Sequence, residues 1–354
     1  MKRLLVNQKD ITQITMDEVP SEPLKAGQAR LKIERFALTT NNITYAATGF
    51  VIGYWHFFPS GIDGQGIVPV WGFGEVVESR SEFAAVGERY YGFYPLADEL
   101  VITPEPQGGA VILDVTEHRR KLPVVYNRYN RGKPKTPEEE GLQSLLQPLL
   151  ATSYLLSDWL QDNGFFEAKQ VIIGSSSSKT GLGLCKFLAE ISPRPVTVVG
   201  LTSAGNKDFV VAQSGCDSVV VYDEIETLEK IPSVYVDMAG NAEVKQRLHA
   251  HLGDLLRHSS AVGTSHWDQF QPKQELAGPK PQFFFAPSQI EKRRADWGPG
   301  EIERQITGAW KRMASDAQTW LDLKEHQGLD AALPVYDALA KGQAAPRDGH
   351  VIAL

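Results

Sequence analysis

The stretch VIIGSSSSKTGLGLCKFLA, residues 171–189, joins a short apolar run to a helix-like segment through four serines, Lys179 and Thr180. A strand, a loop of small residues and a helix, in this order, are typical of a phosphate-binding turn. The start of a helix offers unpaired N–H groups and the positive end of its dipole to an anion. Three interpretations follow. The loop holds the phosphates of a nucleoside triphosphate, those of a nicotinamide dinucleotide, or no ligand.

The triphosphate interpretation rests on fragments. A P-loop needs the pattern GxxxxGK[ST], but four serines follow Gly174, the second glycine is missing and the lysine comes one residue early. VYVDMAG, residues 234–240, resembles a strand that ends in a magnesium-binding Asp, and NKD, residues 206–208, resembles a guanine-reading motif. These two fragments stand in the reverse of the usual order, with the wrong spacing. The triphosphate interpretation is therefore the weaker one.

In the dinucleotide interpretation, the loop follows the first strand of a βαβ unit and the pyrophosphate binds at the helix start. Gly181 and Gly183 remain from the glycine pattern of such loops, and serines replace the other glycines. Serine hydroxyls can donate hydrogen bonds to phosphate, and Lys179 adds a positive charge. We therefore predict that side chains replace glycine amides in this loop. The predicted contacts are Ser175, Ser176, Ser177, Ser178, Lys179, Thr180 and Gly181.

The end of the second predicted strand indicates which dinucleotide binds. A fold that prefers NAD carries an acidic residue there, about 20 residues on, to hold the ribose 2′-hydroxyl. In VVGLTSAGNKD, residues 198–208, no Asp or Glu precedes Asp208. Thr202, Ser203 and Lys207 are present instead. Hydroxyl groups and a lysine suit a 2′-phosphate, so we predict NADP(H). The alternative is that Lys207 is only a solvated lysine at a helix start.

The chain divides into zones of different pattern. Residues 1 to about 115 carry short alternating or apolar runs that Gly, Pro and Asn interrupt, which predicts a β-rich barrel or sandwich. From 169 to 287, β-branched or aromatic runs alternate with helical-length segments, which predicts βαβ units and a parallel sheet. Between them lie a helix capped by Thr136 and a second helical pattern at about 147–162. Residues 288–354 are mainly helical and end in a strand.

Residues 116–135, TEHRRKLPVVYNRYNRGKPK, form a locally basic segment rich in turn residues. One interpretation is a solvated surface loop. The other is a functional segment, either a flap over an anionic ligand or a contact with another subunit. The sequence does not decide between them.

Composition restricts the class of protein. The 354 residues carry a formal net charge of −7, which argues against a nucleic-acid binder, since such proteins usually carry a basic face. Cys185 and Cys216 have no CxxC neighbour, which disfavours a disulfide framework and a cysteine-built zinc site. No apolar run approaches the roughly 18 residues that span a membrane, and the N-terminus is unlike a signal peptide. We expect a cytoplasmic protein with no nucleic-acid or membrane partner.

Four further stretches resemble the medium-chain dehydrogenase/reductase superfamily, specifically its zinc-free, quinone-oxidoreductase-like type. NNITYAATG (41–49) is similar to the segment that lines the substrate site in that superfamily, and VPVWGFGEVVE (68–78) to a glycine-containing core stretch. SGCDSVVVYD (214–223) and VDMAGN (236–241) resemble two motifs of its cofactor domain. The serine loop departs from the superfamily's glycine loop, which indicates a side branch.

The resemblance implies a GroES-like catalytic domain from residues 1–149 and 288–354, and a Rossmann domain with a doubly wound parallel sheet from 150–287. It implies hydride transfer between NADPH and an activated C=C or C=O of a small-molecule substrate, such as a quinone, an enone or an enoyl compound. It also implies a homodimer. The alternative is an NADP(H)-binding sensor or accessory subunit without catalysis. The nicotinamide is expected near Ala239, Gly240, Asn241, Gly263, Thr264 and Ser265.

The catalytic zinc of the superfamily needs cysteine and histidine ligands in the N-terminal half. That half has no cysteine, and His56 and His118 alone cannot build the site. We therefore expect no metal, and hydrogen-bond donors that polarise the substrate instead. The expected donors are Asn41, Asn42 and Tyr45, and the expected pocket residues are Tyr54, Trp55 and His266. The aromatic residues can equally be core, and His266 an ordinary loop histidine.

Overall fold

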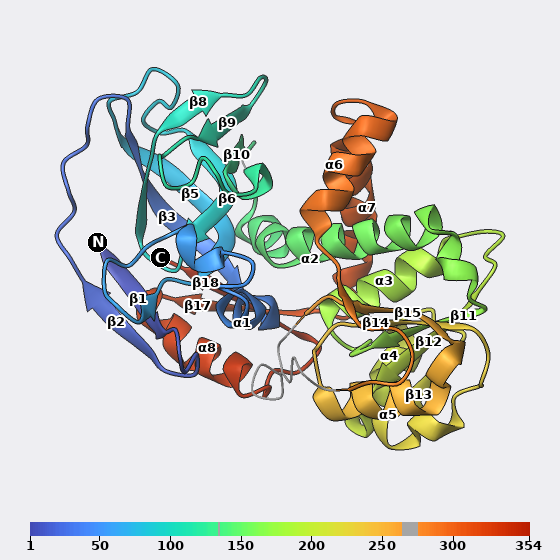
Figure 1. Ribbon diagram of the computed structural model, residues 1–354. Coiled ribbons are helices and arrows are strands. Elements are labelled where there is room, and N and C mark those ends of the chain that lie inside the picture. The colour runs from blue at the N-terminus through green and yellow to red at the C-terminus, as the bar shows by residue number, and fades with distance from the viewer. Residues whose placement is uncertain (134, 264–274) are drawn as a thin grey trace. The chain divides into compact units, whose positions relative to one another are not determined.

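The computed structural model describes residues 1–133, 135–263 and 275–354 (Figure 1). The chain forms two compact units. Unit 1 contains Met1–Gln147 and Gln318–Leu354, and unit 2 contains Pro148–Ala317. The described strands form two sheets in unit 1 and one sheet in unit 2.

Unit 2 is built on a six-stranded sheet in which every described strand pair is parallel. The strand order β13-β12-β11-β14-β15-β16 is the 3-2-1-4-5-6 order of a Rossmann fold. The predicted doubly wound parallel sheet is therefore confirmed. The strands are β11 (Gln170–Gly174), β12 (Thr197–Thr202), β13 (Ser218–Val221), β14 (Ser233–Asp237), β15 (Leu256–Ala261) and β16 (Gln282–Phe283). Connecting helices are α3 (Lys179–Ala189), α4 (Lys207–Gln213) and α5 (Ala242–Leu252).

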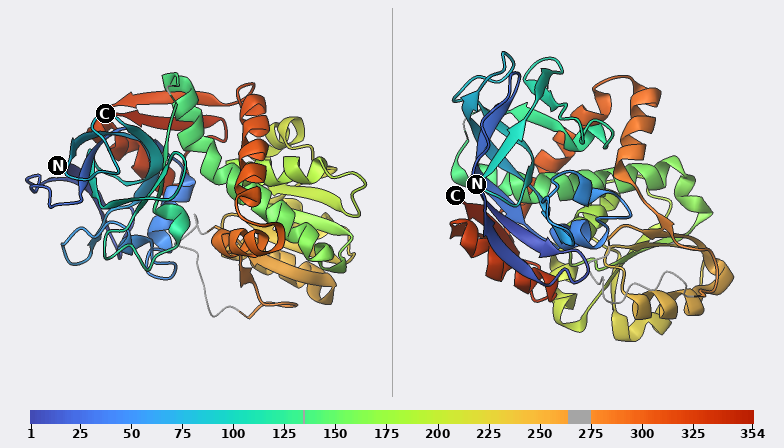
Figure 2. Two further views of the ribbon diagram at one scale, coloured as in Figure 1. Left: turned by 90° about the horizontal axis from the view of Figure 1, so that it is seen from above. Right: turned by 60° about the vertical axis from the view of Figure 1, so that its left-hand side comes forward.

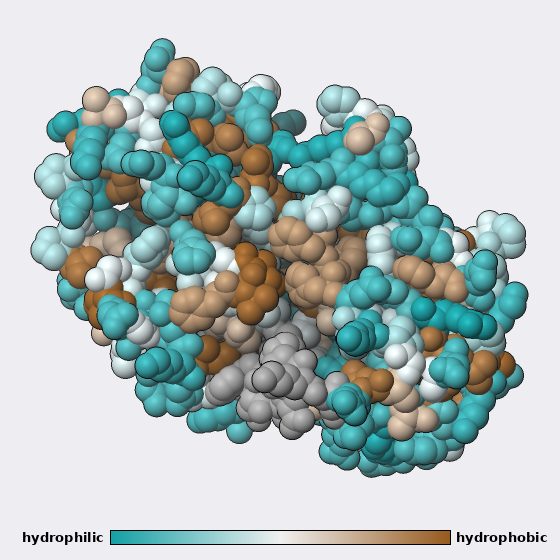
Figure 3. All heavy atoms as spheres, in the orientation of Figure 1, coloured by the Kyte–Doolittle hydropathy of each residue, from teal (hydrophilic) through white to brown (hydrophobic). Residues whose placement is uncertain are grey.

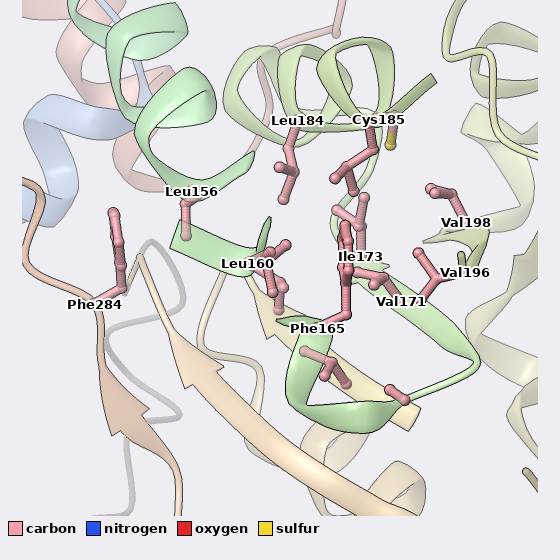
Figure 4. Packing of buried hydrophobic residues seen from close by; sticks show 14 of the residues in the cluster. Leu156, Leu160, Phe165, Val171, Ile173, Leu184, Cys185, Val196, Val198 and Phe284 are labelled. Carbon is pink, nitrogen blue, oxygen red and sulfur yellow. The ribbon is translucent and has the colours of Figure 1, made fainter. Parts of the chain in front are cut away.

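The two faces of this sheet carry separate apolar cores, because successive side chains of a strand point to opposite faces. Val171 and Ile173 lie in one core together with residues of α3, whereas Ile172 lies in the other core with residues of α5. Figure 4 shows Leu184 and Cys185 of α3 pointing toward the strand residues of the first core. The alternation within β11 thus determines which helix covers each face.

A single helix, α2 (Pro137–Asp162), replaces the two helical segments that the sequence indicated. At its start, Glu139 Oε2 accepts from the Thr136 N–H at 2.8 Å, and Thr136 Oγ1 accepts from the Glu139 N–H at 3.2 Å. Such a capping box satisfies N–H groups that have no partner within the helix. The helix continues through Pro148, although a proline removes one backbone hydrogen bond.

Unit 1 is β-rich and is assembled from both ends of the chain, as the resemblance implied. One sheet has the order β2-β1-β4, and the other has the order β17-β18-β3-β5-β6-β10-β9-β8, with β7 paired to β3. The late strand β18 pairs antiparallel with β3, so the end of the chain extends the N-terminal sheet (Figures 1 and 2). The strands are β1 (Lys2–Asn7), β2 (Ile14–Glu18), β3 (Ala29–Leu38), β4 (Gln65–Gly66), β5 (Pro69–Ser79), β6 (Arg89–Pro95), β7 (Glu99–Ile102), β8 (Pro104–Pro106), β9 (Val111–Asp114), β10 (Arg128–Arg131), β17 (Asp322–Gln327) and β18 (Asp348–Ala353). The α-helices that lie wholly in this unit are α1 (Thr40–Ala47) and α8 (Ala332–Ala340).

The second boundary between the units differs from the expected one at 287/288. The helices α6 (Ala286–Trp297) and α7 (Glu301–Ala317) belong to unit 2 and pack against each other (Figure 2). Ile302 of α7 is fully buried in the core that contains residues of α2 and α3. Arg293 Nε of α6 lies 2.7 Å from Asp158 Oδ2 of α2. These contacts attach both helices to the core of unit 2.

The described part of the basic segment 116–135 is built into unit 1 and includes β10. Arg119, near its start, is 1% exposed. Its guanidinium donates to Asp114, to Asn127 Oδ1 at 3.2 Å and to Tyr129 Oη at 3.1 Å. This positive charge is neutralised inside the protein, so it does not contribute to a surface for anions.

Two histidines are buried among the described residues of unit 2. His258 of β15 stacks on Phe166 with ring centroids 4.1 Å apart, and Trp159 lies edge-on to it at 5.1 Å. His249 of α5 places Nε2 3.0 Å from Ser259 Oγ. Burial lowers the pKa of both imidazoles.

The folded protein thus holds both rings neutral, whereas the unfolded chain protonates them below about pH 6.5. Above that pH the two neutral rings contribute fully to the stability of the fold. This contribution is lost as the pH falls toward their lowered folded-state pKa values, so the free energy of unfolding should fall between pH 7 and pH 5. The slope of the free energy of unfolding against pH is set by the number of protons that the chain takes up on unfolding. Replacing His258 with leucine should reduce this number by up to about one. Urea unfolding across this pH range measures the slope. The same comparison at pH 8 gives the packing cost of the substitution, and an unchanged slope would contradict the assignment.

Candidate functional site

The carboxyl ends of β11, β12, β13 and β14 lie on one edge of the unit 2 sheet, because these strands are parallel. The order reverses between β11 and β14: β12 and β13 continue on one side, and β15 and β16 on the other. Ligands of open parallel sheets bind outside the carboxyl ends of the strands at this switch point. The serine loop (residues 174–181) follows β11 and the turn 238–241 follows β14, so both flank the switch point.

The serine loop closes tightly on the start of α3. Ser175 has a φ of 51°, which residues other than glycine rarely adopt. Ser178 caps α3: its Oγ accepts from the Gly181 N–H at 3.1 Å and donates to the Ser175 carbonyl at 2.7 Å. A Cβ on Gly181 would lie 2.5 Å from that carbonyl oxygen. Residue 181 must therefore be glycine for the loop to close in this way.

The serine hydroxyls do not all face a ligand, which differs from the prediction. Ser176 Oγ donates to the Leu201 carbonyl of β12 at 3.1 Å, and Ser178 Oγ donates within the loop. A hydroxyl carries one hydrogen, so these two have none left for a phosphate. Ser177 Oγ accepts from Thr202 Oγ1 at 3.2 Å. Ser176 and Ser177 thus fasten the loop to β12, and Ser178 closes the loop on itself.

The start of α3 carries groups that are suited to an anion. Lys179 and Thr180 are half-exposed and form the first turn of α3. The first N–H groups of a helix have no carbonyl partner within it, and the dipole adds positive charge there. Backbone N–H groups, the Thr180 hydroxyl and the Lys179 ammonium together form a donor set that fits a pyrophosphate.

At the end of β12, the predicted residues separate into buried and exposed groups. Thr202 is fully buried and supports Ser177. Ser203 is half-exposed, and Lys207 begins α4 with its side chain 44% exposed. Lys207 Nζ lies 3.8 Å from Glu224 Oε2, and an exposed pair of this kind contributes little to stability. Ser203 and Lys207 can therefore reach a ligand phosphate, whereas Thr202 positions the loop.

Two residues at this edge were missed by the sequence reasoning. Asn206 Nδ2 donates to Ser177 Oγ at 3.3 Å. Tyr222 follows β13, and its hydroxyl is hydrogen-bonded to Ser175. Burial raises the pKa of Tyr222. Its place directly after the run SVVV, at a carboxyl strand end, was the signal that could have identified it.

A buried carboxylate shapes the turn after β14. Asp237 is 3% exposed, and its Oδ1 accepts from the Ala239 N–H at 3.1 Å and the Gly240 N–H at 2.8 Å. Gly240 has a φ of 76°, which favours glycine. Asn241 caps α5 by accepting from the Val244 N–H at 3.0 Å. Asp237 thus organises the backbone, which does not suit the magnesium role that the triphosphate interpretation gave it.

Further residues expected near the nicotinamide follow β15. The Gly263 N–H donates to the Asp237 carbonyl at 3.4 Å, which places Gly263 at the same edge of the sheet. Thr264, Ser265 and His266 lie outside the described residues.

In unit 1, the expected donors lie on α1. Asn42 is 3% exposed, and both ends of its amide are used: Oδ1 accepts from the Thr39 N–H at 2.7 Å and Nδ2 donates to the Pro69 carbonyl at 2.8 Å. Asn42 therefore caps α1 and ties it to β5. Asn41, one turn before Tyr45, is hydrogen-bonded to the Tyr45 hydroxyl, which also accepts from Trp71 Nε1 at 3.2 Å.

Tyr45 and Tyr54 belong to a buried aromatic cluster. Their ring centroids lie 4.4 Å apart, and Tyr54 Oη lies 3.0 Å from Tyr126 Oη. Burial raises the pKa of all three phenols, so each keeps its proton at neutral pH and can donate a hydrogen bond. The cluster comprises Tyr45, Tyr54, Phe57, Trp71, Phe93 and Tyr126.

Trp55, expected in a substrate pocket, lies in the core. A Cβ on Gly49 or on Gly66 would lie 2.1 Å or 2.3 Å from atoms of its indole. The ring thus fills the space that side chains at these two glycines would occupy.

Within the residues that the structure describes, no three His, Cys, Asp or Glu side chains gather as a metal site would require. His118 Nε2 lies 3.2 Å from the Phe57 carbonyl. In the same ranges, none of the helices has the length and apolar character needed to cross a membrane. The face in Figure 3 is largely hydrophilic, with hydrophobic residues in separate groups.

A family model described as "Protein of unknown function (DUF2855)" matches residues 36–345. No curated protein matches the sequence.

Several solved structures are similar to this chain over its whole length. CurA from Vibrio vulnificus in complex with NADPH has a TM-score of 0.65 at 12% identity, covering 100% of this chain and 99% of that one. The YhdH oxidoreductase from Salmonella enterica in complex with NADP has a TM-score of 0.53 at 15% identity, covering 100% of both chains. A quinone oxidoreductase from Pseudomonas syringae pv. tomato DC3000 has a TM-score of 0.58 at 12% identity, covering 100% and 99%. At these identities the likeness concerns the fold alone.

The closure of the serine loop can be tested by adding a single methyl group at residue 181. Gly181→Ala should lower the free energy of unfolding by about 1–3 kcal/mol, because its Cβ collides with the Ser175 carbonyl. Gly205→Ala is the control, since a Cβ there meets nothing within 4 Å, and it should change stability by less than about 0.5 kcal/mol. Urea unfolding measures both. Equal stability of the two variants would contradict the loop geometry.

Proposed function

The chain belongs to the DUF2855 family, and we propose that it is an oxidoreductase that uses NADP(H). The observation that carries the proposal is the serine loop, a turn closed at Gly181 before a helix start, at the switch point of a sheet in Rossmann order. An anion bound there meets the N–H groups and the positive end of α3. CurA in complex with NADPH and the YhdH oxidoreductase in complex with NADP, which share this fold, support the same cofactor.

The end of β12 supports NADP(H) over NAD(H). Its turn offers Ser203 and Lys207 and has no carboxylate before Asp208. A 2′-phosphate can replace Glu224 as the partner of Lys207, because the exposed pair at 3.8 Å is weak. Tyr222, hydrogen-bonded to Ser175, lies at the neighbouring strand end and borders the same region.

Unit 1 would supply the groups that act on the substrate. When bound, NADPH supplies a hydride. Tyr45, supported by Asn41 and Trp71, would donate a hydrogen bond to the oxygen of a small quinone, enone or enoyl substrate, where negative charge develops. Because burial raises its pKa, the Tyr45 hydroxyl carries a proton throughout the neutral range.

We propose a reaction without zinc. Both cysteines of the chain, Cys185 and Cys216, lie in unit 2. Unit 1 therefore cannot build the cysteine–histidine zinc site of the superfamily. Two free thiols also agree with a cytoplasmic location. The half-exposed Phe283 on the edge strand β16 supports a homodimer formed along this edge.

The second candidate is a protein that binds NADP(H) without turnover, as a sensor or accessory subunit. One observation favours it. Tyr45 is 5% exposed, and its hydroxyl already bonds to Trp71 and Asn41. A substrate must displace one of these partners before it reaches the hydroxyl.

Cofactor binding is tested by titration with NADPH, NADH and ATP–Mg²⁺, followed by fluorescence. NADPH should bind most tightly. Lys207→Ala should weaken the binding of NADPH about 10- to 100-fold, which corresponds to the loss of one charge-assisted hydrogen bond, and leave the binding of NADH unchanged.

Lys230→Ala is the matched control, because this exposed lysine precedes β14 at the opposite edge of the sheet. Binding of ATP–Mg²⁺ without binding of NADPH would exclude the proposed function.

Turnover is tested by screening quinones, enones and enoyl thioesters with NADPH. Tyr45→Phe should lower kcat by about 10²- to 10³-fold, the effect of removing one oxyanion donor, without changing the Kd of NADPH. Tyr336→Phe is the control, since this buried hydroxyl has no hydrogen-bond partner among the described residues. If the native protein binds NADPH and reduces none of these compounds, the second candidate is favoured.

A further inference from the structure

The two cysteines of the chain are neighbours in unit 2. Cys185 belongs to α3, and Cys216 belongs to the turn before β13. Cys216 packs against the core that contains Cys185, and each thiol shifts the pKa of the other. Figure 4 shows the Cys185 sulfur within that core. The proposed function uses neither thiol.

The turn that carries Cys216 is held firmly against α3 and β12. A Cβ on Gly215 would lie 3.3 Å from the Ala189 Cβ at the end of α3, and a Cβ on Gly200 of β12 would lie 3.2 Å from Cys216 Sγ. The Cys216 N–H donates to Ser214 Oγ at 3.1 Å. These contacts keep the Cys216 sulfur beside the helix.

The two thiols differ in access and in acidity. Cys185 is fully buried, and burial raises its pKa. Cys216 is half-buried, and the Cys185 thiol lowers its pKa, with a further contribution from Ser214. The thiolate is the form that reacts with peroxides. Cys216 is therefore the thiol that an oxidant reaches first, and Cys185 is the adjacent partner.

We propose that Cys185 and Cys216 form a redox-sensitive pair that hydroperoxides convert into a reversible disulfide. The Cys216 thiolate attacks one peroxide oxygen, so an S–O bond forms while the O–O bond breaks, and the alcohol or water leaves after taking up a proton. The Cys185 sulfur then attacks the Cys216 sulfenic acid. The S–S bond forms, the S–O bond breaks, and water leaves with the Cys185 proton. The two sulfurs lose two electrons, which the peroxide gains.

The disulfide acts on the helix that carries the serine loop. An S–S bond is about 2 Å long, so forming it draws the Cys216 turn and α3 together. A close-packed core transmits such a shift. Because α3 begins at Lys179 and Thr180, its displacement alters the donor set at its start. This consequence rests on the proposed function, whereas the disulfide does not.

The disulfide is tested on the reduced full-length protein with a small excess of hydrogen peroxide. The number of thiols titrated after denaturation should fall from two to none, because the chain has only Cys185 and Cys216. The intact mass should fall by about 2 Da, and dithiothreitol should restore both values. Thiols that remain titratable, a disulfide between two chains, or oxidation of Cys216 to a sulfinic acid without a cross-link would overturn the proposal.

Two variants separate the roles of the thiols. Cys216→Ser should leave Cys185 unreactive toward peroxide. Cys185→Ala, which keeps a small apolar group in the core, should leave a Cys216 sulfenic acid that a dimedone probe labels. Equal labelling of the native protein and Cys185→Ala would show that Cys185 does not resolve the sulfenic acid, and would overturn the pairing.

The coupling to the cofactor is tested by NADPH titration of the oxidised and reduced native protein. Oxidation should weaken the binding of NADPH about threefold or more, and dithiothreitol should reverse the change. An unchanged affinity in a protein whose disulfide is verified by mass would overturn the coupling alone. Absence of NADPH binding in both states would instead count against the proposed function.

Discussion

The close approach of Gly181 to the Ser175 carbonyl is the constraint on which the candidate cofactor site depends. A side chain at residue 181 would lie 2.5 Å from that oxygen, so the chain can turn directly from β11 into α3 only with glycine there. The turn brings the N–H groups of the first helical residues to the switch point of the sheet. Loops rich in glycine reach a phosphate because they lack side chains. In this loop Ser176 and Ser177 bond to β12 and Ser178 bonds within the loop, so in the proposed function the backbone of the helix start meets the ligand.

Unit 1 shows a second use of hydroxyl groups. Tyr45 and Tyr54 are buried and Tyr126 is half-buried among aromatic rings, and their hydroxyls bond to one another or to Trp71 and Asn41. Burial favours the neutral phenol, so these groups remain donors across the pH range in which a reductase works. In the proposed function, a substrate would displace one of these partners to reach the Tyr45 hydroxyl.

The sequence was most informative where local pattern and topology agree. Alternating apolar runs and helical segments predicted the parallel sheet, and the order of apolar run, serine loop and helical segment predicted the turn from β11 into α3. The direction of each serine hydroxyl was not predictable, because it depends on carbonyls and hydroxyls of β12 about 25 residues away in the chain. The same holds for α6 and α7. Their patterns indicated helices, but only the packing of Ile302 and Arg293 assigns them to unit 2.

Asn42 illustrates a related limit. An amide beside a tyrosine in a substrate-lining motif suggested a catalytic donor, but an asparagine three residues after Thr39 can equally close a capping box. The structure uses both ends of its amide for that purpose and for the Pro69 carbonyl. Residue type and spacing alone cannot distinguish these roles, because both depend on the same hydrogen-bonding groups.

The central claim is that the start of α3 and the end of β12 hold the phosphates of NADP(H). Hydrogen–deuterium exchange with and without saturating NADPH tests it most directly. Amides in residues 175–183 and 202–207 should exchange more slowly, with little change in unit 1 strands such as β9 and β10. Slower exchange confined to other parts of the chain, while NADPH is bound, would contradict it.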